Sequence, residues 1–325
     1  MRKLIGLIII TIVLLVVIIP SSIIYLAGPL QPETGVKVQP NPIYLNVLNV
    51  KAQQIEVMEL EDYLIGVVAA EMPVKFELEA LKAQAVAART YALKRKELAQ
   101  KEPNPHHPGA EICTDSVHCQ AWASPKELKE RWGLIQYFAY RKKISRAVQE
   151  TAGVVITHQG KLIDPVYHST SNGRTDNAGQ VWKFDIPYLV AVESPWDLES
   201  TKYRETIGYT LPELAEKISI PLAQLASSTE LPFRILEVTD GGRIKKIQVG
   251  NQEYTGEDFR RLLSLNSASV TWKREGDKVF FDTLGYGHGV GMSQYGANGM
   301  AKDGRDYQQI LTYYYTGVQL YRVTS

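Results

Sequence analysis

Four glycines alternate with other residues at the start of the segment GYGHGVGMSQYGANGMA, residues 285–301, and this spacing strongly constrains the fold. A strand without a side chain at every second position lets another backbone or a ligand approach closely. The spacing matches neither the dinucleotide-binding fingerprint nor a phosphate-binding loop. A helix is expected to begin shortly after Gly291. We therefore expect the amides beside His288, Ser293 and Gln294 to line a saccharide groove. Tight packing of the strand against the helix that carries Glu71 is the other interpretation, and the two are compatible.

The amino terminus is apolar enough to cross a membrane. Residues 4–27 contain no charged side chain and follow Met-Arg-Lys. As a helix they would be about 36 Å long at ~1.5 Å per residue, which exceeds a hydrocarbon core of about 30 Å. A cleaved secretory signal is the alternative, but bulky residues stand where cleavage needs small ones. We expect residues 1–27 to be a single-pass anchor with its basic end in the cytoplasm, and the proline-rich residues 28–45 to be an extended linker outside the membrane.

Composition and patterning predict a globular α+β protein beyond this anchor. The chain has 325 residues, of which 45% are hydrophobic and 22% charged. Its 36 basic and 35 acidic residues form no long runs, so we expect no nucleic-acid partner. Helices and antiparallel strands are expected to form a cleft in a main domain of residues 46–202 and 276–325. Residues 203–275 form a smaller inserted α+β subdomain, with a hairpin turn at Asp240-Gly241-Gly242 and a helix capped by Thr255.

The stretch ELEDYLIGVVAAEMP, residues 59–73, predicts a helix because acidic residues stand at its start and Pro73 at its end. Three apolar residues form one face of this helix, and Glu71 takes the next position on that face. Burial disfavours the ionised carboxylate, so the pKa of Glu71 should exceed its reference value of about 4.3. Glu71 is then a candidate general acid. The alternative is a structural carboxylate paired with Arg89, from a second helix over about 77–101.

The stretch HHPGAEICTDSVHCQAW, residues 106–122, contains both cysteines and three of the six histidines. His107, Cys113, His118 and Cys119 offer two thiolates and two imidazoles, a ligand set that zinc prefers. The usual short-finger spacings are absent, and a disulfide between the two cysteines is the alternative outside the cytoplasm. Four protein ligands predict a structural Zn²⁺, whereas three would leave a position open for catalysis.

The stretch KLIDPVYHSTSNGRTDNAGQVW, residues 161–182, predicts a strand that ends in a polar turn. Its neutral hydrogen-bonding groups suit sugar hydroxyls and acetamido groups, with Trp182 available to pack on a sugar face. The candidate substrate-binding residues here are His168, Ser169, Thr170, Ser171, Asn172 and Gly173. A hydrogen-bonded surface turn is the alternative. No Gly-x-Ser-x-Gly elbow surrounds the serines, which argues against a serine hydrolase.

Four segments in this order resemble the stage II sporulation protein D family of cell-wall lytic transglycosylases. They are AAEMP at 69–73, ALKAQAVAARTYAL at 80–93, YHSTSNGRT at 167–175 and GHGVGMSQYGA at 287–297. The similarity spans roughly residues 45–320. It implies that Glu71 is the catalytic acid/base and that the two cysteines and two histidines hold zinc. His288, Gln294 and Tyr295 join the expected substrate-binding residues.

The resemblance also implies a substrate and a setting. The expected reaction cleaves the bond between N-acetylmuramic acid and N-acetylglucosamine in peptide-stripped glycan strands and leaves 1,6-anhydro ends. It would occur during sporulation engulfment, in the mother-cell membrane facing the forespore, alongside the amidase stage II sporulation protein P.

Two other functions stay open at this point. If Glu71 is buried and paired, the protein could be a glycan-binding scaffold that activates the amidase without cutting. If only three residues bind zinc, the chain could itself be a metallo-amidase. Loss of function in a Glu71→Gln variant argues against the scaffold, and peptide release that chelators abolish supports the amidase.

Overall fold

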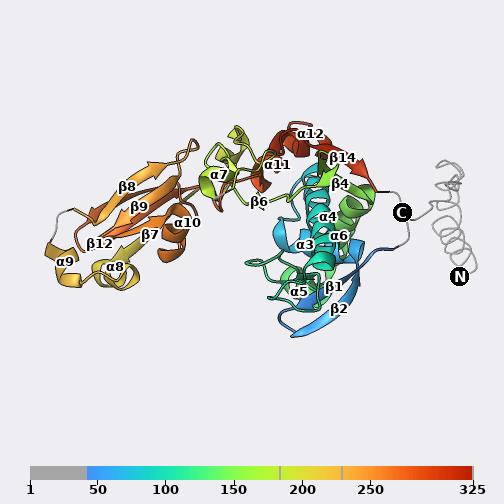
Figure 1. Cartoon of the computed structure of the whole chain (residues 1–325), viewed down its shortest axis with the longest axis horizontal. Coiled ribbons are helices and arrows are strands. Elements are labelled where there is room, and N and C mark those ends of the chain that lie inside the picture. Colours follow the sequence, from blue (N-terminus) through green and yellow to red (C-terminus); the bar gives the residue numbers. More distant parts are fainter. Residues whose placement is uncertain (1–41, 183, 228–229, 324–325) are drawn as a thin grey trace, which may run out of the picture. The chain divides into compact units, whose positions relative to one another are not determined.

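A computed structural model describes residues 42–182, 184–227 and 230–323 (Figure 1). The expected anchor at 1–27 and most of the expected linker lie outside the described residues. Within the described ranges, no helix combines the length and apolar character that a membrane crossing requires. The first strand, β1 (Tyr44–Asn49), already includes the last two residues of the expected linker.

Helices build the larger of two hydrophobic cores. Helix α4 (Leu78–Lys101) packs against α3 (Leu60–Glu71) and α6 (Leu134–Glu150) and against the carboxy-terminal helices α11 (Gln294–Lys302) and α12 (Tyr307–Tyr314). The many alanines of α4 are fully buried, and small side chains let the helices approach closely. The shorter helices are α5 (Pro125–Trp132), α7 (Ala178–Val181) and the 3-10 helix η2 (Pro195–Glu199). Both long helices expected from the sequence are confirmed.

Three small sheets border this core. In one, β1 pairs antiparallel with β2 (Gln54–Glu59) and parallel with β3 (Ile112–Cys113). In another, β4 (Val154–His158) lies between β14 (Gln319–Arg322) and β5 (Lys161–Leu162). In the third, β6 (Tyr167–His168) pairs parallel with β13 (Met292–Ser293). This last pair joins the polar loop to the glycine-rich segment, two regions more than 100 positions apart in the sequence.

A second core lies in the inserted subdomain. It comprises β7 (Arg204–Thr210), α8 (Leu211–Ile218), α9 (Leu222–Ser227), β8 (Phe233–Val238), β9 (Ile244–Val249), β10 (Gln252–Thr255), α10 (Gly256–Leu262), β11 (Val270–Glu275) and β12 (Lys278–Leu284). The expected hairpin joins β8 to β9, and Thr255 caps α10 by accepting from the backbone N–H of Asp258. The expected boundary at residue 275 falls within the β11–β12 hairpin. Phe281 of β12 is fully buried in this second core, so β12 packs with the subdomain.

The glycine-rich segment packs closely against other parts of the chain. Gly289 and Gly291 have φ angles of 81° and 70°, which disfavour other residues. A Cβ on Gly291 would lie 2.2 Å from the carbonyl oxygen of Val166, and one on Gly289 would lie 2.4 Å from Cζ of Arg243. The segment therefore lies against the approach to β6 and against an arginine of the inserted subdomain. Its expected helix is confirmed as α11, which Ser293 caps.

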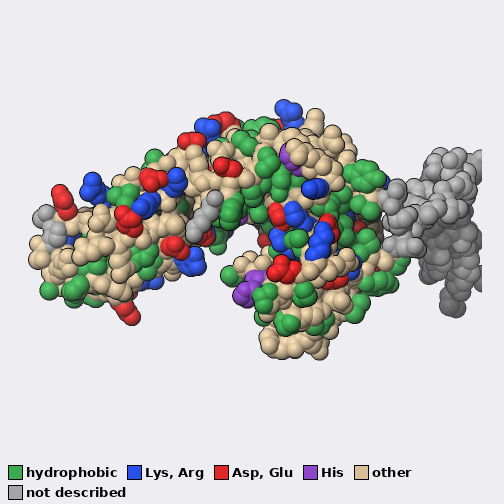
Figure 2. Space-filling view, in the orientation of Figure 1, with side chains coloured by type: hydrophobic (Ala, Val, Ile, Leu, Met, Phe, Trp, Pro, Cys, Tyr) green, Lys and Arg blue, Asp and Glu red, His purple; other side chains and the backbone are tan. Residues whose placement is uncertain are grey.

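Charged side chains of both signs are interspersed on the face shown in Figure 2. Among the described residues, some charged side chains pair with a neighbour one helical turn away, such as Lys101 with Glu97 and Arg146 with Glu150. Exposed pairs of this kind add little to stability. They do show that part of the surface charge is neutralised locally.

Candidate active site

Glu71 lies at the carboxy-terminal end of α3 and lines a pocket of 330 Å³. Four other predicted site residues line the same pocket: His168, Ser169, Gln294 and Tyr295. They come from β6 and the loop after it and from the start of α11. The pocket also includes Pro73, Tyr167, Lys202 and Tyr286, which the sequence did not single out. The parallel pairing of β6 with β13 thus brings the polar loop and the glycine-rich segment together beside Glu71.

Two hydrogen bonds hold the Glu71 carboxyl group. The backbone N–H of Ala121 donates to Glu71 Oε1 over 2.7 Å, and the Tyr167 hydroxyl donates a second bond. The side chain of Gln120 in turn donates to the Tyr167 hydroxyl oxygen over 3.1 Å. Burial raises the pKa of Glu71 above its ordinary value of 4.5, and the two hydrogen bonds partly oppose this rise. The raised pKa agrees with the expectation from its position on the apolar face of the helix.

Arg89 is not the partner of Glu71. Its fully buried guanidinium donates to both carboxylate oxygens of Glu61, over 2.9 and 2.6 Å. It also donates to the backbone carbonyls of Val148 and Val154. Arg89 therefore forms its ion pair with Glu61, at the opposite end of α3 from Glu71. Glu71 is left free of a cationic partner in these contacts.

The polar loop divides into residues that face the Glu71 pocket and residues that hold the loop. His168 Nδ1 donates to the carbonyl of Val290 over 3.1 Å, which leaves Nε2 as an acceptor without a partner among the described residues. Ser171 donates to the buried carboxylate of Asp197 over 2.6 Å, and Thr170 bonds the hydroxyl of Ser200. Thr170 and Ser171 are almost fully buried. These two therefore contribute to loop structure, whereas His168 and Ser169 line the pocket.

Asp197 organises this region, although no sequence pattern pointed to it. Three serine hydroxyls donate to its carboxylate, from Ser171, Ser194 and Ser293, over 2.6 to 2.7 Å. Burial raises its pKa, and the three hydrogen bonds oppose the rise. The carboxylate thus joins the polar loop to the start of α11.

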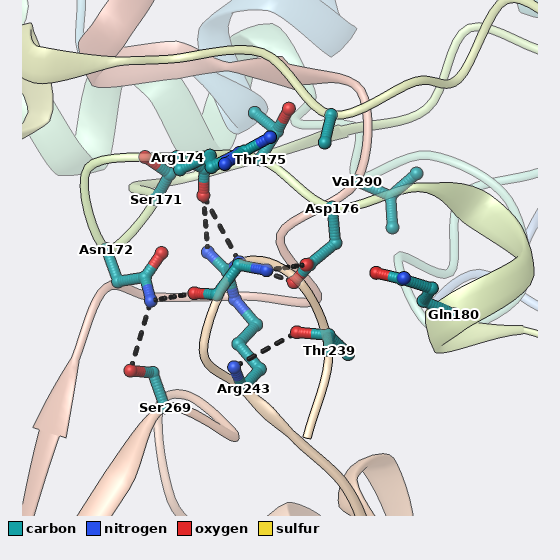
Figure 3. A network of polar contacts seen from close by, with 12 residues as sticks. Ser171, Asn172, Arg174, Thr175, Asp176, Gln180, Thr239, Arg243, Ser269 and Val290 are labelled. Atoms are coloured by element: carbon teal, nitrogen blue, oxygen red, sulfur yellow. Dashed lines mark hydrogen bonds and ion pairs between the residues drawn. The ribbon is translucent and has the colours of Figure 1, made fainter. Parts of the chain in front are cut away.

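Asn172 belongs to a second network, centred on Arg243 of the inserted subdomain (Figure 3), whereas Gly173 bonds to Ser194. Asn172 Nδ2 donates to the carbonyl of Gly241 over 2.7 Å, and the Gly173 carbonyl accepts from Ser194 N. Arg243 Nη1 pairs with Asp176 Oδ2 at 2.6 Å, and both side chains are buried. The hairpin turn between β8 and β9 is thereby joined to the polar loop. We find Asn172 in this junction rather than among the residues that line the Glu71 pocket.

His288 and Trp182 are not among the residues that line the Glu71 pocket. His288 Nε2 donates to the carbonyl of Tyr167 over 3.1 Å, and Nδ1 accepts from Val290 N–H. Burial lowers the pKa of His288 to about 4, so the imidazole is neutral at pH 7. The Trp182 ring lies 5.1 Å from the His288 ring, centroid to centroid. The described contacts of His288 support the backbone of the site.

The four predicted metal ligands converge. The ligand atoms of His107, Cys113, His118 and Cys119 all lie within 4.8 Å of one another, and both cysteines are free thiols rather than a disulfide. Cys119 Sγ is 3.4 Å from His118 Nδ1 and 3.7 Å from His107 Nε2. Ligand atoms of a tetrahedral zinc site with bonds of about 2.0–2.3 Å lie about 3.3–3.8 Å apart. The donor types and their spacing fit zinc.

The hydrogen bond of His107 also fits a metal ligand. Its Nδ1 donates to the carbonyl of Ala110 over 2.9 Å, which presents the lone pair of Nε2 to the cluster. The cluster ends at Cys119, directly before Gln120 and Ala121, which contact the Glu71 site. The cysteine–histidine loop is therefore joined to the Glu71 carboxyl group through the two residues that follow Cys119.

The groups that orient Glu71 were not predicted from the sequence. Gln120 and Tyr167 stand beside residues that were singled out, Cys119 and His168, and this adjacency was the available signal. The hydrogen bond from Ala121 comes from its backbone N–H. Every residue except proline has this group, so the sequence could not indicate which one would bind Glu71. Lys202 belonged to no motif identified in the sequence, and Tyr286 lay within the glycine-rich segment without being singled out.

Comparison with known proteins agrees with the motifs. Residues 49–158 match the family model described as stage II sporulation protein. The chain is 40% identical over 280 residues to a stage II sporulation protein D of Bacillus subtilis, covering 86% of this chain and 79% of the relative. It is 39% identical over 285 residues to the protein of that name from Bacillus amyloliquefaciens, covering 88% and 80%. A Bacillus subtilis protein named amidase enhancer is 28% identical over 309 residues, covering 79% of this chain and 40% of that protein. The chain belongs to the stage II sporulation protein D family.

Proposed function

We propose that this sporulation protein is a lytic transglycosylase that cleaves the bond between N-acetylmuramic acid and N-acetylglucosamine in peptide-stripped peptidoglycan strands. The observation that carries the proposal is the Glu71 carboxyl group, whose pKa is raised by burial in a pocket of 330 Å³. Among the described residues that line this pocket, Glu71 is the one carboxylic acid. The other polar groups are hydroxyl, amide, imidazole and ammonium groups, which suit a sugar substrate.

A single carboxyl group suffices if the substrate supplies the nucleophile. Most glycosidases use two carboxylates, because one protonates the leaving group and the other acts as nucleophile or activates water. Here protonated Glu71 would donate its proton to the glycosidic oxygen as the C1–O bond breaks. The resulting carboxylate would then accept the proton of the muramic acid C6 hydroxyl as its oxygen bonds to C1. The product carries a 1,6-anhydro ring, no water is consumed, and Glu71 is protonated again.

Residues around Glu71 supply donors and acceptors for the sugar. His168 Nε2 is an acceptor that a sugar hydroxyl or an acetamido N–H would satisfy. The side chain of Gln294 donates to Gln84 of α4, which leaves its carbonyl oxygen to accept. The Tyr295 ring packs edge-on against Phe76, at 4.8 Å between centroids. Contacts from such fixed groups accelerate cleavage where they strengthen in the transition state.

We assign a structural Zn²⁺ to His107, Cys113, His118 and Cys119. When bound, the ion would hold the loop 106–121 closed by coordinate bonds. Four converging protein ligands favour this role over a metallo-amidase, which needs an open position. The loop delivers the Ala121 N–H and the Gln120 amide to the Glu71 site. The zinc ligands would therefore affect the acid through its hydrogen-bond donors.

The setting we propose is engulfment, with the chain anchored in the mother-cell membrane and its folded part facing the forespore. The apolar residues 4–27 support an anchor, and family membership supports sporulation. A partner amidase, stage II sporulation protein P, would remove the peptides first. The relative named amidase enhancer supports a link to an amidase.

The test is digestion of peptide-free glycan strands by the full-length protein, with products identified by mass spectrometry. We expect fragments with anhydro-muramic acid ends, one water lighter than hydrolysis products. A Glu71→Gln variant should form none, whereas Glu130→Gln, at an exposed position of α5, should cut like the unmodified protein. Hydrolysis products, or cutting by Glu71→Gln, would refute the proposal.

A non-catalytic glycan-binding scaffold that activates the amidase is the second candidate. The name of the amidase enhancer relative favours it. This function predicts that the protein binds glycan strands without shortening them. It also predicts that Glu71→Gln stimulates the amidase as well as the unmodified protein does.

A further inference from the structure

Among the described side chains that line the Glu71 pocket, Lys202 is the one lysine or arginine. It is exposed and comes from the turn that follows η2. Its ammonium lies 5.8 Å from the centroid of the Tyr286 ring, another residue of the pocket lining. Among the described residues, the Lys202 ammonium lies near an aromatic ring and forms no ion pair with a carboxylate. The ammonium is therefore available to an anionic ligand in the pocket.

The backbone that carries Lys202 is firmly held. Its N–H donates to the Ser200 hydroxyl over 3.0 Å, and that hydroxyl also bonds Thr170 of the polar loop over 3.1 Å. The carbonyl of the next residue, Tyr203, accepts from the N–H of Gly285 over 2.7 Å. The turn is thus joined both to the polar loop and to the glycine-rich segment. Such a turn limits where the Lys202 side chain can reach.

The proposed substrate carries one charged group that distinguishes it from intact peptidoglycan. The lactyl group on O3 of muramic acid ends in a carboxylate once its peptide has been removed. In a peptide-bearing strand the same carbon forms an uncharged amide that continues into the peptide. A lysine in the pocket discriminates between the two forms, because it forms an ion pair only with the carboxylate, whereas the uncharged amide carbonyl can accept a hydrogen bond but adds no opposite charge.

We propose that Lys202 binds the lactyl carboxylate of peptide-free muramic acid and so determines the selectivity of the site for strands that an amidase has already processed. This inference rests on the proposed function, because it takes the glycan strand as the ligand of the pocket. It assigns selectivity to one ammonium group and not to pocket size alone. An amide-hydrolysing reaction must then supply the substrate.

The test measures binding, so that it does not depend on cleavage. The full-length Glu71→Gln protein is titrated with two probes, peptide-free strands and the same strands with their lactyl carboxylates converted to methylamides. The methylamide removes the charge and adds little bulk. We expect roughly tenfold tighter binding of the carboxylate form, the size of a single charge-assisted contact of ~1.4 kcal/mol. The preference should shrink as salt concentration rises.

Two variants then locate the preference. Adding Lys202→Met should make the affinities for both probes equal, at the value for the methylamide. Adding Lys126→Met, at an exposed position of α5, should leave the preference unchanged. Equal binding of both probes by the Glu71→Gln protein, or a preference that survives Lys202→Met, would overturn the proposal. If the preference follows Lys202 while the unmodified protein leaves strands uncut, recognition stands and the lytic reaction fails.

Discussion

The buried ion pair between Arg243 and Asp176 joins the inserted subdomain to the polar loop, and its removal gives a sharp test of the structure. The perturbation is Arg243→Met, which keeps much of the side-chain volume and deletes the charge. It would remove the contact of Nη1 with Asp176 Oδ2 and two donations to the carbonyl of Arg174 over 3.2 Å. The Asp176 carboxylate, fully buried, would keep a single hydrogen bond from Gly241 N–H.

The expected cost follows from this burial. Removing one partner of a buried pair leaves an uncompensated charge and typically costs about 3–5 kcal/mol. Arg261 offers a matched control, because it pairs with Asp258 at 2.9 Å while 73% of its side chain is exposed. An exposed pair of this kind is worth about 0.2–1 kcal/mol. The two arginine-to-methionine changes should therefore differ by about 2 kcal/mol or more.

Urea denaturation of the full-length protein, followed by circular dichroism, measures both free energies of unfolding. The double variant Arg243→Met/Asp176→Asn should recover part of the loss, because no unpaired charge stays buried. The reasoning is refuted if Arg243→Met costs no more than Arg261→Met. It is also refuted if the double variant loses the full sum of its two single changes.

Three further predictions concern the site. Burial raises the pKa of Glu71 above 4.5. Between pH 4.5 and the raised pKa, the folded chain therefore keeps a proton on Glu71 that the unfolded chain loses. The free energy of unfolding should fall as pH rises through this window. Glu71→Gln should therefore gain stability over the unmodified protein as pH rises from 4.5, in urea titrations at several pH values; a pH-independent difference would contradict this. Gly66→Ala should destabilise α3 by about 1–3 kcal/mol, although alanine favours helices, because its Cβ would lie 2.2 Å from Trp122 Nε1; a stabilised variant in thermal melts would contradict the packing. Elemental analysis should find one zinc per chain, and chelation should make the loop 106–121 sensitive to proteases and abolish glycan cutting; a metal-free chain whose loop still resists proteolysis would rule out the structural role.

Local patterns in the sequence predicted local structure well. Helical spacing and acidic residues at the helix start located α3, and a single threonine located the cap of α10. Glu71 was found because a carboxylate on an apolar helical face must be buried when that face packs. The convergence of the four candidate metal ligands was predictable because they lie within thirteen positions, so that a single loop brings them together. Each of these inferences depends on residues close in the chain.

The partners of these residues were beyond reach of the sequence. Arg89 was a plausible partner for Glu71, but helix packing places it on Glu61, at the other end of α3. The close contacts of the glycine-rich segment with the residue before β6 and with Arg243 were not predicted. In each case the sequence supplied a group that needs a partner, and several partners of the same chemistry were available.

What the sequence determined by itself was the α+β character, the half-buried position of Glu71 on an apolar helical face, and the convergence of two cysteines and two histidines in one loop. The tertiary structure alone decided that Ala121 and Tyr167 hold Glu71, and that Lys202 shares its pocket. The physical reason is the distance along the chain over which each kind of interaction acts. Helical periodicity, capping and ligand spacing act over a few residues, whereas the pocket joins segments up to about 220 positions apart, and only the packing of both cores sets which of them meet.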